Sequence, residues 1–342
     1  MYKTRNVIVL SILLFIAGCG GSPSSSEHQK NTHTPSILLP ENRAHEFSLN
    51  AETTKVYLDV AYGNHERQTL DLFIPNHTET IPLIIYLHGG AFTHGGKDEF
   101  YDQASANTVV NYLMNNKIAF ALVNYRLLPL APDIDDEGIL KPMGDITYAL
   151  QFLRYFSDRL NVNTNKIGLV GSSAGAGSAL WINTVGDQAD PENSNLIKRE
   201  STLVSVVALS NTQSTYDFVK WETEVFPQGQ WTLELDHRTQ NIYGGVENLS
   251  SLYSEQRLLD YRSKVDMLAK LSSQDGAIYI YNTALESNFS DPLHHPYHSQ
   301  VLYNQALAAG ISTDAYIEDL GINTLGTAIN PFLFVANFLT SQ

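Results

Sequence analysis

A serine between two glycines follows an apolar run near the middle of this sequence. The stretch reads GLVGSSAGAG over residues 168–177, and Ser173 is the central residue of a G-x-S-x-G pattern. Gly171 and Gly175 would permit a sharp turn with close backbone approach. Such a turn between a strand and a helix directs the serine toward the free N–H groups of the helix N-terminus, which favour an oxyanion. Ser173 is therefore a candidate nucleophile, and a glycine-rich turn without chemistry is the alternative interpretation.

A second glycine-rich stretch supplies what acyl transfer would need beside a nucleophile. YLHGGAFTHGG spans residues 86–96, after a predicted strand. Backbone N–H groups aimed at a developing oxyanion stabilise it, and glycines leave those groups unobstructed. We predict that the N–H groups of Gly90, Ala91 and Ala174 donate hydrogen bonds to this oxyanion. His88 is interpreted as a brace for the loop rather than as a base.

Four motifs together resemble the α/β-hydrolases of the carboxylesterase and hormone-sensitive-lipase kind. They are HGGAF at 88–92, VNYRLLP at 123–129, GSSAG at 171–175 and SDPL at 290–293, in the family's order. The resemblance implies ester hydrolysis through an acyl-enzyme, without a metal or an organic cofactor. It also implies structural roles for Tyr125 and Arg126.

The sequence departs from this family at the base that must accept the serine proton. The family places a histidine in the loop after the last strand. Here that region, residues 314–332, contains no histidine, and Asn323 or Thr324 stands at the expected place. Neither side chain can act as a base near neutral pH.

Three interpretations of the missing base remain. One of His294, His295 and His298 could reach Ser173, because these residues follow the predicted seventh strand beside the site. The chain could instead be an inactive binding module that keeps the pocket. The three histidines with Asp291 could also bind a metal, which their loose spacing disfavours. For any one of the three histidines taken singly, hydrogen bonding at a helix start is the favoured interpretation.

The acid that orients the base has two candidates. Asp291 matches the family's D-P-L, and it lies three to seven residues before the histidines. Glu286 lies closer to the end of the predicted strand. We favour Asp291, because an orienting carboxylate must lie close to its imidazole.

Strands alternate with helices around these motifs, which predicts a mostly parallel sheet with helices on both faces. Fully apolar runs are typical of buried parallel strands, and two alternating segments favour an antiparallel pair before them. The antiparallel pair is expected at 55–63 and 68–75, and the later strands at 82–90, 118–127, 166–173, 203–210, 277–283 and 314–319. Helices are expected at 101–115, from about 145, at 296–310 and at 330–339.

The N-terminus has the pattern of an export signal. Lys3 and Arg5 precede an apolar run that ends in IAGC, which resembles the lipobox of bacterial lipoproteins. The resemblance implies lipidation of Cys19, the only cysteine, and Gly20 after it implies sorting to the outer membrane. A plain secretory signal is the alternative. The expected location is therefore the bacterial cell envelope, with a lipid anchor in the membrane.

Composition and charge narrow the remaining possibilities. The chain has 342 residues, 43% hydrophobic and 17% charged, with a net charge of −15, which argues against a nucleic-acid partner. We expect a signal peptide at 1–19, a polar tether at 20–45 and an α/β-hydrolase domain at 46–342. Residues 212–264 break the strand–helix rhythm and form a possible lid insert. The predicted activity is cleavage of small or medium acyl esters, with a small-molecule ester as the substrate.

Overall fold

One mixed sheet forms the centre of the part of the chain that the computed structural model describes, which is residue 49 and residues 54–341. Its strands are ordered β1-β2-β4-β3-β5-β6-β7-β8-β9. The strands are β1 (Thr54–Ala61), β2 (Thr69–Pro75), β3 (Ile81–Leu87), β4 (Ala119–Val123), β5 (Val162–Ser172), β6 (Val206–Ser210), β7 (Ala277–Asn282), β8 (Thr313–Ile317) and β9 (Ile322–Asn323). Strands β4, β3, β5, β6, β7 and β8 are parallel, while β1, β2 and β9 pair antiparallel.

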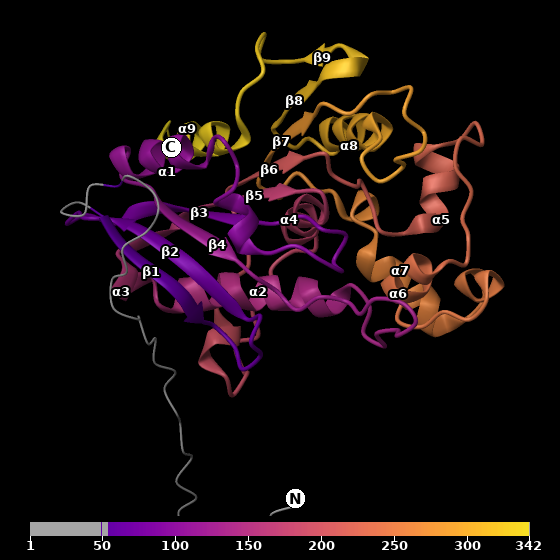
Figure 1. Ribbon diagram of the computed structural model, residues 1–342, viewed down its shortest axis with the longest axis horizontal. Coiled ribbons are helices and arrows are strands. Elements are labelled where there is room, and N and C mark those ends of the chain that lie inside the picture. Colours follow the sequence, from indigo (N-terminus) through magenta and orange to yellow (C-terminus); the bar gives the residue numbers. More distant parts are fainter. Residues whose placement is uncertain (1–48, 50–53, 342) are drawn as a thin grey trace, which may run out of the picture. The chain divides into compact units, whose positions relative to one another are not determined.

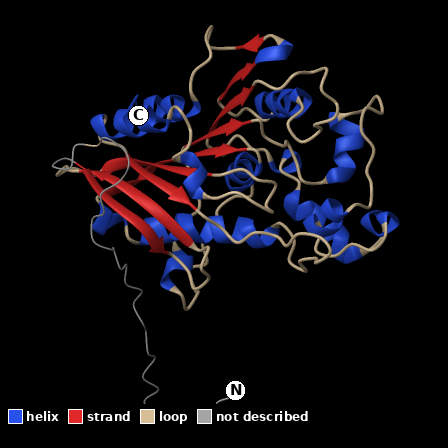
Figure 2. Ribbon diagram, viewed as in Figure 1, coloured by secondary structure: helices blue, strands red, loops and turns tan. Residues whose placement is uncertain are grey.

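Helices cover both faces of this sheet (Figure 2). They are α1 (Ala106–Asn115), α2 (Leu140–Tyr155), α3 (Ser157–Leu160), α4 (Ala174–Thr184), α5 (Phe218–Lys220), α6 (His237–Ile242), α7 (Gln256–Val265), α8 (Pro296–Ala308) and α9 (Pro331–Ser341). Helices α1 and α9 pack on one face, and α2, α4 and α8 lie on the other (Figure 1).

The apolar character of the strands follows from burial on both faces. Along β3, Leu83 and Ile85 pack into the core on the α4 side, whereas Ile84 and Tyr86 pack into the core under α9. Successive strand residues point to opposite faces, so a strand covered on both sides must be apolar throughout. The prediction of a mostly parallel sheet between two helical layers is confirmed.

Three boundaries differ from the sequence-based expectation. Helix α2 begins at Leu140, not near 145, since Pro142 fits the first turn of a helix, where its missing N–H costs no hydrogen bond. Helix α1 begins at Ala106, after a short 3₁₀ turn at Lys97–Phe100. Beyond β8 the chain folds back as β9 instead of forming an open loop.

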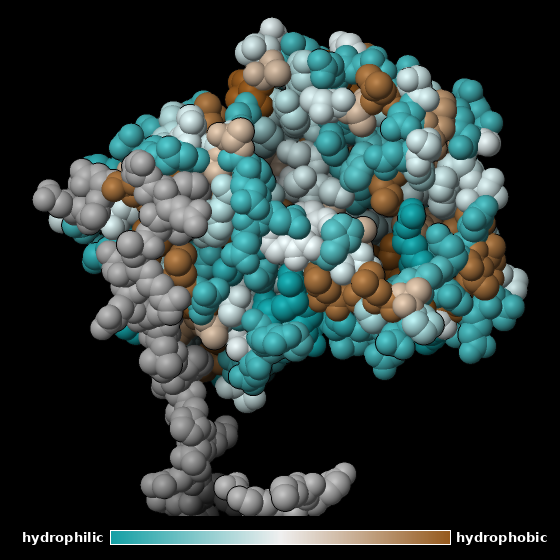
Figure 3. Space-filling view, viewed as in Figure 1, coloured by the Kyte–Doolittle hydropathy of each residue, from teal (hydrophilic) through white to brown (hydrophobic). Residues whose placement is uncertain are grey.

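Two further observations concern the hydropathy of the surface and of the helices in the described residues. Hydrophobic residues lie in separate patches on the mostly hydrophilic face that Figure 3 shows. Within residues 54–341, no helix combines the length and the apolar character that crossing a membrane requires. Cys19 and the predicted tether lie outside the described residues.

Candidate active site

The backbone at Ser173 has the strained conformation of a sharp turn. Ser173 joins β5 to α4 with φ 51° and ψ −119°, a region that non-glycine residues rarely adopt. A Cβ atom on Gly175 would lie 2.1 Å from the carbonyl oxygen of Leu87, and one on Gly171 would lie 2.3 Å from that of Gly175. Both glycines are therefore required by close backbone approach, and the turn they permit lifts Ser173 above the carboxyl ends of the strands.

A histidine and a carboxylate form a chain of hydrogen bonds with the serine hydroxyl. The Oγ of Ser173 lies 2.8 Å from Nε2 of His294, and Nδ1 of His294 lies 2.7 Å from Oδ2 of Asp291. A carboxylate can only accept, so Nδ1–H donates to Asp291 and Nε2 is left to accept from Ser173. This is the tautomer in which an imidazole can take a serine proton.

The other two candidate histidines are engaged elsewhere. His295 lies at the N-cap of α8, where Nδ1 accepts from the N–H of Tyr297 and Nε2 donates to the carbonyl of Glu286, 2.8 Å away. His298 is fully buried, and its Nε2 donates to the carbonyl of Pro292 at 3.1 Å. Burial lowers the pKa of His298 to about 3 and also lowers that of His295. The structure thus brings only His294 of the three into contact with Ser173.

Two other positions make structural contacts instead of belonging to the site. They are the place where the family resemblance would put the base and the place of the alternative acid. Thr324 donates a hydrogen bond to Asp314, and its N–H binds the carbonyl of Ala315 on β8, so it belongs to the β8–β9 hairpin. The Glu286 carboxylate accepts from the hydroxyl of Tyr297 at 2.8 Å. Among residues 54–341, no three metal-ligating side chains gather in a way that could hold a metal ion.

The HGGAF loop turns sharply beside Ser173. Gly90, Ala91 and Phe92 have φ values of 106°, 50° and 63°, and the carbonyl of Gly90 accepts from the N–H of His94. Ala91, Ser173 and Ala174 line one small pocket. Ala174 opens α4, where the first N–H groups have no acceptor within the helix. Two of the residues predicted as oxyanion donors, Ala91 and Ala174, therefore line the same pocket as the serine, and Gly90 directly precedes Ala91.

His88 lies behind this loop as a buried, neutral ring. It stacks on Tyr125 with ring centroids 4.2 Å apart, and the hydroxyl of Tyr125 donates to the carbonyl of His88. Burial lowers the pKa of His88 to about 4. Arg126 pairs with Asp145, 2.7 Å away. All these contacts fix the loop and the strand ends beside it.

The segment 212–264 forms a wall of the pocket at Ser173. Five of its residues line that pocket: Gln213, Tyr216, Phe218, Arg238 and Ile242. Phe218 and Arg238 also line an adjoining cavity of about 570 Å³, together with Trp231 and Pro292. The tight space at the serine thus has a larger one beside it, between this segment and the loop after β7.

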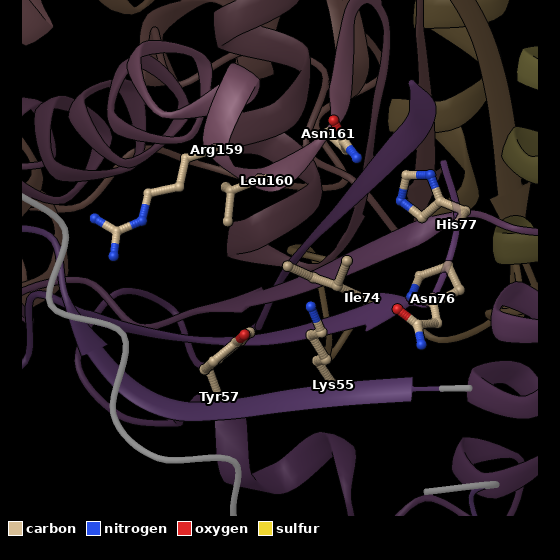
Figure 4. A pocket seen from close by; sticks show the side chains of 9 residues that line it. Lys55, Tyr57, Ile74, Asn76, His77, Arg159, Leu160 and Asn161 are labelled. Atoms are coloured by element: carbon tan, nitrogen blue, oxygen red, sulfur yellow. The ribbon is translucent and has the colours of Figure 1, made fainter. Parts of the chain in front are cut away.

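A further hollow lies near the amino end of β5, beside residues of β1 and β2 (Figure 4). It is lined by Lys55, His77 and Arg159, among others, and Asn161 directly precedes β5. Ser173 follows the carboxyl end of that same strand, so this hollow is separate from the site. Ligands of open α/β sheets bind at the carboxyl ends of the strands.

Two site residues were not identified from the sequence. Gln213 donates to the carbonyl of Leu293 at 2.7 Å, and Asn282 donates to the carbonyl of His294 at 3.1 Å. Asn282 ends β7, and Gln213 follows β6 after two residues. Their place at the carboxyl ends of parallel strands was the available signal, but nothing in the sequence reveals which carbonyls they bind.

Comparisons with known proteins identify a family and several relatives of this chain. Residues 70–250, more than half of the chain, match the family BD-FAE. A probable isoprenylcysteine alpha-carbonyl methylesterase of Arabidopsis thaliana is 28% identical over 126 residues, which are 36% of this chain and 27% of that protein. Glutactin of Drosophila melanogaster is 25% identical over 111 residues, 32% of this chain and 10% of glutactin. The chain therefore spans a tenth to about a quarter of these relatives.

Solved structures share the fold over most of the described chain. An acetyl ester-xyloside bifunctional hydrolase from Caldicellulosiruptor lactoaceticus superposes with a TM-score of 0.55 at 17% identity, covering 90% of this chain and 96% of that one. A bifunctional GH43-CE protein of Bacteroides eggerthii has a TM-score of 0.62 at 15% identity, covering 84% of this chain and 38% of that one. At such identities the likeness concerns the fold, which is that of the α/β-hydrolases.

Proposed function

We propose a hydrolytic function on the premise that this chain belongs to the BD-FAE family and has the α/β-hydrolase fold. The reaction that we propose is the hydrolysis of carboxylic esters through a covalent acyl-enzyme. The roles we assign are nucleophile to Ser173, general base to His294 and orienting acid to Asp291. The single observation that carries the proposal is the 2.8 Å contact between Ser173 Oγ and His294 Nε2.

The first half of the reaction forms the acyl-enzyme. His294 Nε2 takes the proton of Ser173 as Oγ attacks the ester carbonyl carbon, and Asp291 stabilises the imidazolium that forms. Negative charge develops on the carbonyl oxygen, and the N–H groups of Gly90, Ala91 and Ala174 stabilise it by donating hydrogen bonds to that oxygen. The bond to the alcohol oxygen then breaks, and His294 returns the proton to the leaving alcohol.

The second half releases the acid with the same groups. Water enters where the alcohol left, His294 takes one of its protons, and the resulting hydroxide attacks the acyl carbon. The same backbone donors stabilise the second oxyanion. Collapse of this intermediate breaks the bond to Ser173 Oγ, which recovers its proton from His294, and the carboxylic acid leaves.

The shape of the site favours an ester with one compact and one larger part. The pocket at Ser173 is narrow, whereas the adjoining cavity has room for a bulky group. Aromatic rings of Phe218 and Trp231 line that cavity beside the Arg238 side chain. We propose that the larger part of the substrate occupies it.

Reaction with a fluorophosphonate probe tests the assignment of the nucleophile. The probe should label the parent protein covalently, and the Ser173→Ala variant should remain unlabelled. Ester turnover on a broad panel should follow the labelling. If the folded parent neither labels nor exceeds the Ser173→Ala background, the chain is instead a binding protein that has kept the hydrolase pocket.

The proposed location is the bacterial cell envelope, with a lipid on Cys19 as the anchor. The support is the IAGC sequence after an apolar run, followed by a polar stretch. A tether of about 25 residues would allow the catalytic domain to act at a distance from the membrane.

A further inference from the structure

The segment that carries both the acid and the base is held by its backbone carbonyls. Residues 292, 293 and 294 are consecutive, and each of their carbonyl oxygens accepts a hydrogen bond from a different buried side chain. His298 donates to Pro292, Gln213 donates to Leu293, and Asn282 donates to His294. These donors come from three parts of the fold: α8, the segment after β6, and the end of β7.

Gln213 links this segment to the helix that begins at the nucleophile. Its Nε2 binds the Leu293 carbonyl at 2.7 Å, and its Oε1 accepts from the hydroxyl of Tyr216 at 3.0 Å. Tyr216 packs so closely on α4 that a Cβ atom on Gly177 would lie 2.1 Å from its hydroxyl oxygen. Through Gln213 and Tyr216, the segment that carries the base is therefore positioned relative to α4, the helix that starts after Ser173.

Asn282 has all its bonding groups engaged within the protein. Its Nδ2 donates to the His294 carbonyl and to the hydroxyl of Ser299, and its Oδ1 accepts from the N–H of Ala284. Asn282 is fully buried, so its amide is fixed on the end of a central strand. The carbonyl of the base residue itself is thus held by the sheet.

His298 performs the same task for Pro292 with an imidazole ring. Nε2 donates to that carbonyl, so Nδ1 is an acceptor, and it lies 3.0 Å from the hydroxyl of Ser214. The ring is held edge-to-face by Trp221, with centroids 4.4 Å apart, and by Phe226. Because both nitrogens have partners and the ring is enclosed, its contribution is geometric.

We propose that Asn282, Gln213 and His298 are positioning residues that keep His294 Nε2 within hydrogen-bond reach of Ser173. The inference rests on the proposed function, since it concerns the base of that reaction. It explains how a base carried on the acid's own segment can be held accurately. Asp291 and His294 share one short stretch without a strand or helix of its own, so its backbone must be fixed from outside.

The test measures kcat, KM and thermal stability of Asn282→Ala, His298→Phe and Gln213→Leu, each in the parent and in the His294→Ala background. We expect kcat in the parent background to fall by about ten-fold to a hundred-fold, because small displacements of a catalytic group have effects of this size. KM for Asn282→Ala and His298→Phe should stay within about two-fold, because neither residue lines the pocket at Ser173. In the His294→Ala background the same changes should have no further effect on kcat.

Two matched controls separate positioning from general stability. Gln151 is a buried glutamine that donates to the carbonyls of Lys198 and Glu200, and Asn183 is a buried asparagine that binds Gly276. Gln151→Leu and Asn183→Ala should lower the melting temperature while kcat of the folded protein stays within about two-fold of the parent, because these carbonyls lie away from the site.

The outcomes distinguish this inference from the proposed function. If His294→Ala keeps the parental kcat, the assignment of the base is wrong. If His294→Ala loses activity but the three positioning variants behave like the controls, the positioning role is wrong. The same conclusion follows if the three changes lower kcat equally in the His294→Ala background. Gln213→Leu preserves volume, so the question stays decidable if one of the other variants does not fold.

Discussion

At the scale of single residues, the unusual feature is the spacing between acid and base. Asp291 and His294 are three residues apart, and their side chains meet at 2.7 Å. Their mutual distance is set by local backbone, so only the placement of the pair against Ser173 depends on the rest of the fold. Both side chains are partly exposed, 31% for His294 and 42% for Asp291, as expected where a substrate must enter.

The acid can be tested against its rival carboxylate. Asp291→Asn should lower kcat by up to about 10⁴-fold, because an amide in that position favours the wrong tautomer of His294. Glu286→Gln should leave kcat within a few-fold, since Glu286 binds Tyr297 rather than the imidazole. Steady-state kinetics on one ester decides between them. A large loss in Glu286→Gln with an active Asp291→Asn would reverse the assignment.

At the scale of elements, two segments have different relations to the site. The stretch after β8 pairs back as β9, which uses the residues at the family's usual base position in sheet hydrogen bonds. The 212–264 segment packs Trp221, Tyr243 and Leu258 into the core, all fully buried, while other parts of it wall the pocket. The segment that the sequence predicts as a lid insert is thus also part of the core. Its role as a lid over the site stays a prediction.

The adjoining cavity gives a test of selectivity. Trp231 lines it and is only partly buried, so Trp231→Ala should change the ratio of kcat/KM between a bulky and a small ester by about ten-fold. Tyr253→Ala is the control, because Tyr253 is an exposed aromatic residue of the same segment that does not line the cavity. An unchanged ratio for Trp231→Ala would show that the larger part of the substrate binds elsewhere.

Much of this architecture could be predicted from the sequence. Fully apolar strands and the GSSAG and HGGAF motifs indicate the fold, because burial and close backbone approach dictate those residue types directly. The choice among His294, His295 and His298 could not be made in this way. It depends on where α8 starts and on which carbonyls Asn282 and Gln213 bind, and these are contacts between distant parts of the chain.

At the scale of the whole molecule, stability should depend on two buried histidines. The pKa of His298 is lowered to about 3 and that of His88 to about 4, whereas in an unfolded chain both would titrate near 6.5. Between pH 6.5 and about 4 the unfolded chain binds protons that the folded protein does not. The free energy of unfolding should therefore fall as the pH falls, by at most about 1.4 kcal/mol per pH unit for each histidine.

Denaturant unfolding at several pH values measures this dependence. The His298→Phe variant should have a smaller slope between pH 6.5 and 4 than the parent, since one of the two histidines is gone. His65→Phe, a change at an exposed histidine, should keep the parental slope. A parental free energy of unfolding that stays constant from pH 7 to pH 5 would contradict the prediction.

Attachment to the envelope is tested at the same scale. The Cys19→Ser variant should move from the membrane pellet into the soluble fraction, because the anchor that we propose is a lipid on that thiol. Ester turnover of the released protein should match that of the parent, as the tether separates anchor and site. A variant that stays in the pellet would contradict the proposed anchor.

The central claim is that His294 is the base for Ser173, and its loss is the most direct test. Ester kcat/KM should be measured for the parent, for His294→Ala, and for the Ser173→Ala background. His77→Ala serves as a control, since His77 lines the hollow near the amino end of β5, which is separate from the site (Figure 4). We predict that His294→Ala falls by at least about 10³-fold, toward the Ser173→Ala background, while remaining folded, and that His77→Ala keeps the parental rate. A folded His294→Ala variant within about ten-fold of the parent would contradict the account.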